Sequence, residues 1–160
     1  MMRKILPLIL VLWLTLAAAC QPVVAPGSPG NGAVTQQSAQ TPLPGSKFNK
    51  LFPKPDGDYT LVYTQEKNGF AEAKLNYKGN EAATLAISDT ATNPSAVDKY
   101  KTAAKKISSY PAVAVGDNGT AILVADRFQV QVRSKDATFT ASDRETWLAK
   151  FDLAGLAALK

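Results

Sequence analysis

The sequence predicts an α+β domain in which an antiparallel sheet of about six strands carries two main amphipathic helices on one face. Three observations lead to this class. Apolar and polar residues alternate in several segments, most regularly from Ala71 to Lys78, as in half-buried strands. Turns as short as Lys67-Asn68-Gly69 connect these segments, and such turns join antiparallel strands. Two later segments carry apolar residues at helical spacing.

Four elements open the predicted domain. The first is a short helical turn over 46–52, which Pro53 ends and which has Phe48, Leu51 and Phe52 on one side. Strands are expected over 59–64, 71–78 and 82–88, preceded by the turns Asp56-Gly57-Asp58, Lys67-Asn68-Gly69 and Lys78-Gly79-Asn80. The apolar members of the last two strands should face the core: Ala71, Ala73, Leu75, Tyr77, Leu85 and Ile87.

A helix is expected next. Asn93-Pro94-Ser95 supplies start signals, and these apolar residues follow at helical spacing: Val97, Tyr100, Ala104 and Ile107. The remaining surface of this helix carries the candidate anion-binding residues: Lys99, Lys101, Lys105 and Lys106. The competing interpretation is a solvated helix face whose late lysines complement the helix dipole. The pattern favours the solvated face, because charge runs on amphipathic helices usually serve solvation.

The strand pattern then repeats. Strands are expected over 110–115, 120–125 and 128–133, with Gly116-Asp117-Asn118-Gly119 as the turn between the first two. A terminal helix should open at Ser142, where Glu145 three residues later completes a capping box, and Asp152 should cap a last turn. This order predicts two strand-strand-strand-helix units. The outer sheet face is expected to be wet, and it carries Glu72, Lys74, Lys78, Gln129, Gln131 and Arg133.

The segment before the domain begins with a leader. Arg3 and Lys4 form a basic start, an uncharged apolar run of about 12 residues follows, and Ala17-Ala18-Ala19 precedes Cys20. These are the parts of a secretory signal, whereas a membrane-spanning helix needs about 20 apolar residues. Residues 1–19 are therefore predicted to be a signal peptide that is removed before Cys20.

The run Leu16-Ala17-Ala18-Ala19-Cys20 resembles the lipobox of bacterial lipoproteins, and the resemblance covers only the first 20 residues. It departs from that pattern in having Ala17 where the family prefers leucine. The resemblance implies that the Cys20 thiol carries lipid and that Cys20 is the mature N-terminus. The competing interpretation, an incidental thiol, leaves an exported chain with one unpaired cysteine that is open to oxidation. The residue after the cysteine is Gln21, and not the aspartate that often retains lipoproteins on the inner membrane. This implies that the protein lies on the outer membrane in a two-membraned bacterium and on the cell exterior in a single-membraned one.

Residues 20–46 are predicted to form a lipidated cysteine and a flexible tether, because proline, glycine and small polar residues dominate and no charge precedes Lys47. Residues 47–160 should form a single globular domain. The chain has 18 basic residues, and removal of Arg3 and Lys4 leaves 16 against 13 acids. The resulting charge of about +3 is far below that of the dense basic stripe of nucleic-acid binders.

The chemistry available to the domain is narrow. The chain has no histidine and its one cysteine lies in the tether, which excludes histidine-based triads, histidine-ligated metal and a thiolate nucleophile. The remaining catalytic options are paired carboxylates or a Ser-Lys pair, for which the candidates are Ser134-Lys135 and Ser108 near Lys105 and Lys106. Asp56 and Asp58 fall short of a calcium loop and fit a turn better. Asn118-Gly119-Thr120 matches a glycosylation sequon, but it fits a hairpin turn.

These features lead to one expectation and two alternatives. The expected protein is membrane-anchored, lies on the extracytoplasmic side, has no cofactor or metal and binds an envelope protein or polymer without catalysis. One alternative is a small surface hydrolase that works without histidine. The other is a polyanion-binding module that uses the lysine-bearing helix.

Overall fold

The computed structural model describes residues 40–159 of the chain, and these fall within one compact unit, Gln37–Lys160. The predicted signal peptide, Cys20 and most of the predicted tether lie outside the described residues.

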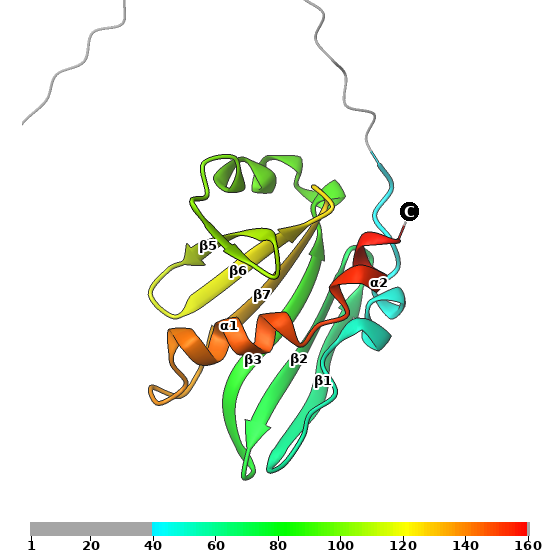
Figure 1. Cartoon of the computed structure of the whole chain (residues 1–160). Coiled ribbons are helices and arrows are strands. Elements are labelled where there is room, and N and C mark those ends of the chain that lie inside the picture. The colour runs from blue at the N-terminus through cyan, green and yellow to red at the C-terminus, as the bar shows by residue number, and fades with distance from the viewer. Residues whose placement is uncertain (1–39, 160) are drawn as a thin grey trace, which may run out of the picture. The chain divides into compact units, whose positions relative to one another are not determined.

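Short 3-10 helices, strands and two α-helices make up the described part of the chain (Figure 1). The 3-10 helices are η1 (Gly45–Lys47), η2 (Asn49–Leu51), η3 (Thr90–Thr92) and η4 (Pro94–Tyr100). The strands are β1 (Tyr59–Lys67), β2 (Phe70–Tyr77), β3 (Asn80–Asp89), β4 (Lys105–Ile107), β5 (Tyr110–Val115), β6 (Gly119–Val124) and β7 (Phe128–Ser134). The α-helices are α1 (Ala141–Ala149) and α2 (Leu153–Ala157).

The α+β class is confirmed, but the expected number of strands is wrong. Within residues 40–159 the sheet has seven strands in the order β1-β2-β3-β7-β6-β5-β4, and every neighbouring pair is antiparallel. The extra strand is β4, which lies in the segment expected to be helical. The two expected strand-strand-strand-helix units are also absent from this region, because three strands precede the 3-10 segment and four follow it.

The predicted helix over Asn93 to Ile107 is replaced by η4 and β4. Ser108 and Ser109 have positive φ values of 48° and 72°, so the chain reverses tightly behind β4. This turn pairs Ile107 with Tyr110 and Lys105 with Ala112. Ladder hydrogen bonds and the burial of Ile107 therefore outweigh the local helical pattern. The helical spacing described only the first part of the segment, where Tyr100 is buried.

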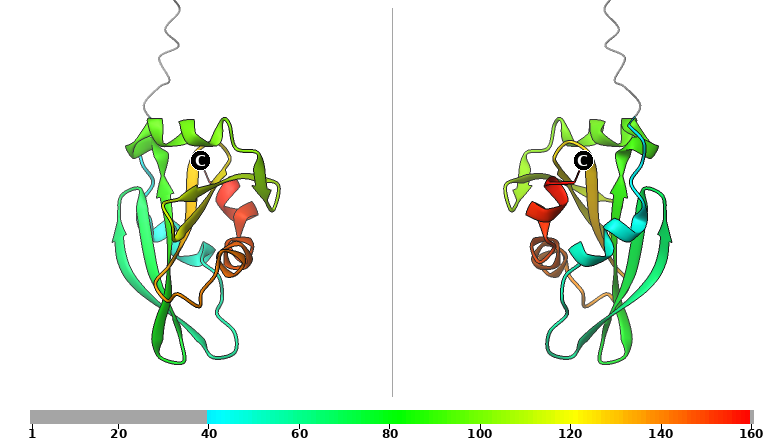
Figure 2. Two further views of the ribbon diagram at one scale, coloured as in Figure 1. Left: turned by 90° about the vertical axis from the view of Figure 1, so that its left-hand side faces the viewer. Right: turned by 90° about the vertical axis from the view of Figure 1, so that its right-hand side faces the viewer.

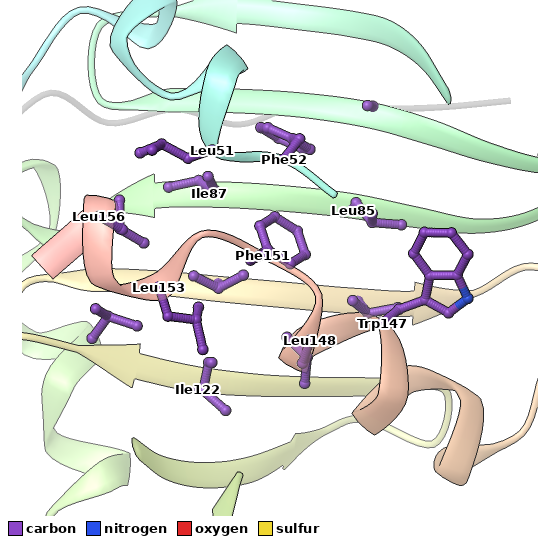
Figure 3. Packing of buried hydrophobic residues seen from close by; sticks show 14 of the residues in the cluster. Leu51, Phe52, Leu85, Ile87, Ile122, Trp147, Leu148, Phe151, Leu153 and Leu156 are labelled. Atoms are coloured by element: carbon purple, nitrogen blue, oxygen red, sulfur yellow. The ribbon is translucent and has the colours of Figure 1, made fainter. Parts of the chain in front are cut away.

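One face of the sheet carries the main core. Figure 3 shows side chains of α1 and α2 directed at the strands, with Trp147 on the side of Leu85, Leu148 near Ile122 and Leu156 near Ile87. Figure 2 shows α1 and α2 on the same side of the sheet, and η1 and η2 also pack into this core. The expected short helical turn with buried Phe48, Leu51 and Phe52 is thus confirmed as η1 and η2.

The cap of α1 lies two residues earlier than expected. The Thr140 side chain accepts a hydrogen bond from the Asp143 N–H, and the Asp143 carboxylate accepts one from the Thr140 N–H at 2.8 Å. This is a capping box, but its members are Thr140 and Asp143 and not Ser142 and Glu145. The predicted cap at Asp152 is confirmed, because its carboxylate accepts from the Gly155 N–H at 2.8 Å.

Helical segments lie on both faces of the sheet, whereas the sequence predicted helices on one face only. On the outer face, Tyr100 of η4 packs with Ala121 and Leu123 of β6, and Val97 and Val113 border them. Every residue of β6 is therefore buried. The outer face is covered over β5 and β6, and its other half, over β2, β3 and β7, is polar.

Where the chain enters the domain, it is held by hydrogen bonds to the side chain of Asp89, which is fully buried. We call this arrangement the Asp89 clamp. Its carboxylate accepts hydrogen bonds from the Leu43 N–H at 3.0 Å and from Arg127 Nε and Nη2 at 3.0 and 2.8 Å. Arg127 Nη2 also donates to the Thr41 carbonyl at 3.1 Å, and the Gly69 N–H donates to the Leu43 carbonyl at 2.7 Å. Residues 41–46, expected within the tether, thus include a segment held against the sheet.

Candidate functional site

The open half of the outer face is built from three adjacent strands in strict register. Glu72 of β2 lies opposite Ala86 of β3, which lies opposite Gln131 of β7. One row further along, Lys74, Thr84 and Arg133 are aligned in the same way. Alternation along each strand places these side chains on one face.

The small residues of β3 make this face concave. Thr84, Ala86 and Ser88 form a low floor, and longer side chains of β2 and β7 rise on either side of it. Two strand spacings separate the walls, about 10 Å between the backbones of β2 and β7. The resulting hollow of about 370 Å³ is called the sheet trough, and it is lined by Phe70, Glu72, Lys74, Glu81, Thr84, Ala86, Ser88, Gln131, Arg133 and Lys135.

The trough carries charges of both signs. Lys74 Nζ and Glu81 Oε2 are 2.7 Å apart, and the hydrogen bond and charge of Glu81 raise the pKa of Lys74. On the same wall the Thr64 hydroxyl donates to the Glu72 carboxylate at 3.0 Å. Across the floor, Arg133 Nη1 donates to Asn118 Oδ1 at 2.7 Å. The walls therefore present a carboxylate on β2 and a guanidinium on β7.

Four of the six residues expected on the wet outer face line the trough: Glu72, Lys74, Gln131 and Arg133. Gln129 lies one step away on β7, where the Tyr100 hydroxyl donates to its Oε1 at 3.0 Å. Lys78 lies in the β2–β3 turn, outside the trough. The role of Thr84, Ala86 and Ser88 as the floor of a trough was not predicted from the sequence, although these residues alternate with buried ones in a strand that was expected there.

The four candidate anion-binding lysines do not share a helix face. Lys99 lies at the end of η4 with its Nζ 5.2 Å from the Tyr100 ring centroid, and burial lowers the pKa of Lys99. Lys101 pairs with Asp98 at 2.7 Å, and Lys105 pairs with Glu145 of α1. Lys106 is exposed in β4. Two of the four charges are thus opposed by neighbouring carboxylates.

A second hollow lies on the inner face, where the sheet extends past α1. Tyr77 and Tyr59 are cross-strand neighbours with ring centroids 4.8 Å apart, and Tyr59 packs against Trp147 at 5.0 Å. The hollow measures about 480 Å³ and is called the tyrosine hollow. It is lined by Tyr59, Tyr77, Lys78, Asn80, Ala82, Asp136, Thr138, Phe139 and Asp143.

The residues considered for other chemistry have structural partners. The Ser134 hydroxyl donates to the Phe139 carbonyl at 2.6 Å and accepts from Arg144 Nη1 at 2.8 Å. Ser134 is buried, whereas Lys135 lines the outer trough. In the sequon, Asn118 Nδ2 donates to the Ser134 carbonyl at 2.9 Å. These contacts occupy the Ser134 hydroxyl and the Asn118 amide.

The paired aspartates before β1 are separated by their partners. Asp56 pairs with Lys150 at 3.2 Å, and Asp58 pairs with Lys78 at 3.6 Å. Within residues 40–159, no group of three or more potential ligands is placed to hold a metal ion. In the same part of the chain, no helix has the length and apolar character that a membrane crossing requires.

Comparison of the chain with models of protein families, with curated proteins and with solved structures gives no match.

Proposed function

We propose that this chain is a lipid-anchored, extracytoplasmic protein of a bacterial cell envelope that binds an extended envelope component in the sheet trough and does not act as an enzyme. The leader and the lipobox-like run ending at Cys20 support the location. Several acyl chains on one residue give stable anchoring, whereas a single chain is marginal.

The observation that supports the binding role is that the two halves of the outer sheet face differ in polarity and in covering. Over β5 and β6 that face is apolar and covered by η4. Over β3 it is polar, hollow and open, with a floor of small side chains. The backbones that carry the walls are about 10 Å apart, so an extended chain about one strand spacing wide, about 5 Å, fits between the wall side chains. It would meet the Glu72 carboxylate on one side and the Gln131 amide and Arg133 guanidinium on the other.

The two alternatives have weaker support. A hydrolase based on Ser134 needs a nucleophilic hydroxyl, but this hydroxyl donates its proton to the Phe139 carbonyl. A polyanion-binding helix needs several lysines on one face, but Lys101 and Lys105 lie on different elements and have carboxylate partners. The trough therefore remains the better candidate surface.

Site-specific photocross-linking in cells tests the proposal. A photoreactive benzoylphenylalanine replaces Gln131 in the trough wall of the full-length chain, and irradiation should yield one dominant cross-linked product. The same probe at Thr60, which is exposed on β1 and outside the trough, is the matched control and should not yield that product.

A blocking substitution completes the experiment. Ala86→Trp fills the trough floor with a large side chain, and we expect it to remove the product of the Gln131 probe. The melting temperature of Ala86→Trp shows whether the domain still folds. A product that persists in a folded Ala86→Trp variant, or that also forms from Thr60, would contradict binding in the trough.

A further inference from the structure

The tyrosine hollow contains an exposed aromatic surface that folding does not explain. Tyr77 is 41 % exposed, one of three large apolar side chains exposed in the described residues together with Val62 and Tyr63. Of these three, Tyr77 is the one that lines the tyrosine hollow. Its ring packs against that of Tyr59, which is half-buried and packs in turn on the buried Trp147, and the Lys78 Nζ lies 5.2 Å from the Tyr77 ring centroid. The hollow thus has an aromatic wall.

Polar groups stand around this wall in fixed positions. Asp143 is held by the Thr140 N–H and hydroxyl at 2.8 and 2.7 Å, and these hydrogen bonds lower its pKa. Asp136 is held in the same way by the N–H and hydroxyl of Thr138. Each carboxylate has further lone pairs to offer a ligand hydroxyl. The Asn80 amide adds both a donor and an acceptor to the lining.

We propose that the tyrosine hollow binds a sugar ring of a cell-envelope glycan. A sugar ring has one face of C–H groups, which packs on an aromatic ring, and a rim of hydroxyls that bind carboxylates and amides. The hollow supplies both kinds of group, and its volume of about 480 Å³ suits a small ligand. The lining carries two carboxylates, Asp136 and Asp143, and one ammonium, that of Lys78, which pairs with Asp58 at 3.6 Å, so it disfavours an anionic ligand.

The tyrosine hollow and the first described residues lie at opposite ends of the domain. The chain enters the domain beside Gly69, at the start of β2, and the tyrosine hollow lies at the opposite end of the same strand. Figure 1 shows the β2–β3 turn at the bottom and the first described residues near the top. Eight residues of strand separate the two ends by roughly 25 Å.

Tryptophan fluorescence of the mature protein in detergent tests the inference. The chain has two tryptophans, and because Trp13 lies in the leader that is predicted to be removed, Trp147, next to Tyr59, is the reporter. The probes are tetrasaccharides of β-linked N-acetylglucosamine, β-linked glucose and α-linked glucose. We expect at least one to change the fluorescence saturably, with the same affinity by calorimetry.

Substitutions then locate the site. Tyr77→Ala should weaken binding about tenfold, as expected for the loss of one stacking ring, while Tyr77→Phe should retain most of the affinity. Val62→Ala removes an equally exposed apolar group outside the hollow and should leave the affinity unchanged. Thermal melts of the three variants establish that each is folded.

Two results would overturn the inference. One is that none of the three tetrasaccharides binds the folded protein. The other is that Tyr77→Ala binds with the affinity of the wild type. If Ala86→Trp in the trough abolishes binding and Tyr77→Ala leaves the affinity unchanged, the glycan is the ligand of the sheet trough. In that case the tyrosine hollow is not a sugar site, and the proposed binding role of the trough stands.

Discussion

Asp89 organises more of this domain than any other single side chain described here. It is fully buried, and its carboxylate joins the first described residues, η3 and the turn between β6 and β7. Sequence periodicity did not single it out, because its partners Leu43 and Arg127 are 46 and 38 residues away along the chain. A buried carboxylate stays charged only when such partners are present. Local patterns do not reveal these partners.

Removal of the Asp89 carboxylate should strongly destabilise the domain. Asp89→Ala leaves Arg127 without its ion pair, and breaking a buried pair costs about 3 to 5 kcal/mol. Urea unfolding measures this loss. Asp126→Asn is the matched control, because Asp126 is exposed and its positive φ of 52° suits asparagine. Equal stability of Asp89→Ala and the wild type would show that the clamp contributes nothing.

The clamp should also make stability depend on pH. Burial alone would raise the pKa of Asp89, but hydrogen bonds from Arg127, Leu43 and Ala91 outweigh burial and hold it below its ordinary value. The folded state therefore binds the proton more weakly than the unfolded state. The stabilisation is complete above about pH 4, the ordinary carboxyl pKa, and is lost as the pH falls through the lowered pKa.

Unfolding titrations at a series of acidic pH values test this dependence. The free energy of unfolding should fall less steeply below about pH 4 in Asp89→Asn than in the wild type. Some slope should remain, because hydrogen bonds also lower the pKa of Asp136 and Asp143. Identical slopes in the two proteins would contradict the assignment of a lowered pKa to Asp89.

At the scale of elements, the sequence predicted structure well where the signal is local. The strand alternation around Leu75 and the caps of the last turn were correct. The helix ending at Ile107 was wrong, because its last residues pair with β5 through a turn at Ser108 and Ser109. Tertiary contacts decide whether such a segment forms a helix or pairs as a strand, and hydrophobic periodicity gives no information about these contacts.

The position of the α1 cap gives a test at this scale. Thr140→Ala removes the side chain that accepts from the Asp143 N–H and should cost about 1 kcal/mol. Ser142→Ala removes the residue that the sequence pattern favoured, and it should change stability little because Ser142 is exposed inside the first turn. Chemical denaturation of both variants decides the point. A larger loss in Ser142→Ala would contradict the capping box described here.

Three regions mark the described part of the molecule. The chain enters the domain at one end, the polar sheet trough lies on one sheet face, and the tyrosine hollow lies at the far end of the other sheet face. The walls of the trough follow from strand alternation and were predicted as wet positions. The trough itself was not predictable, because it requires β3 to lie between β2 and β7. The pairing of Ala83 with Ser134 that places β7 there joins residues far apart in the chain. Sequence patterns alone define strand faces but not strand neighbours.

The proposed membrane anchoring rests on one residue, Cys20. We expect that the protein extracted from membranes begins at Cys20 and that this residue carries a diacylglyceryl thioether. Replacing it by serine should release the protein from the membrane fraction, because no other acylated thiol is possible in a chain with one cysteine.

Mass spectrometry of the mature N-terminal peptide is the most direct measurement. We expect a peptide that starts at Cys20 and is heavier than its unmodified mass by the attached lipid. An N-terminal peptide with an unmodified Cys20 thiol, or a mature chain that retains residues 1–19, would contradict it.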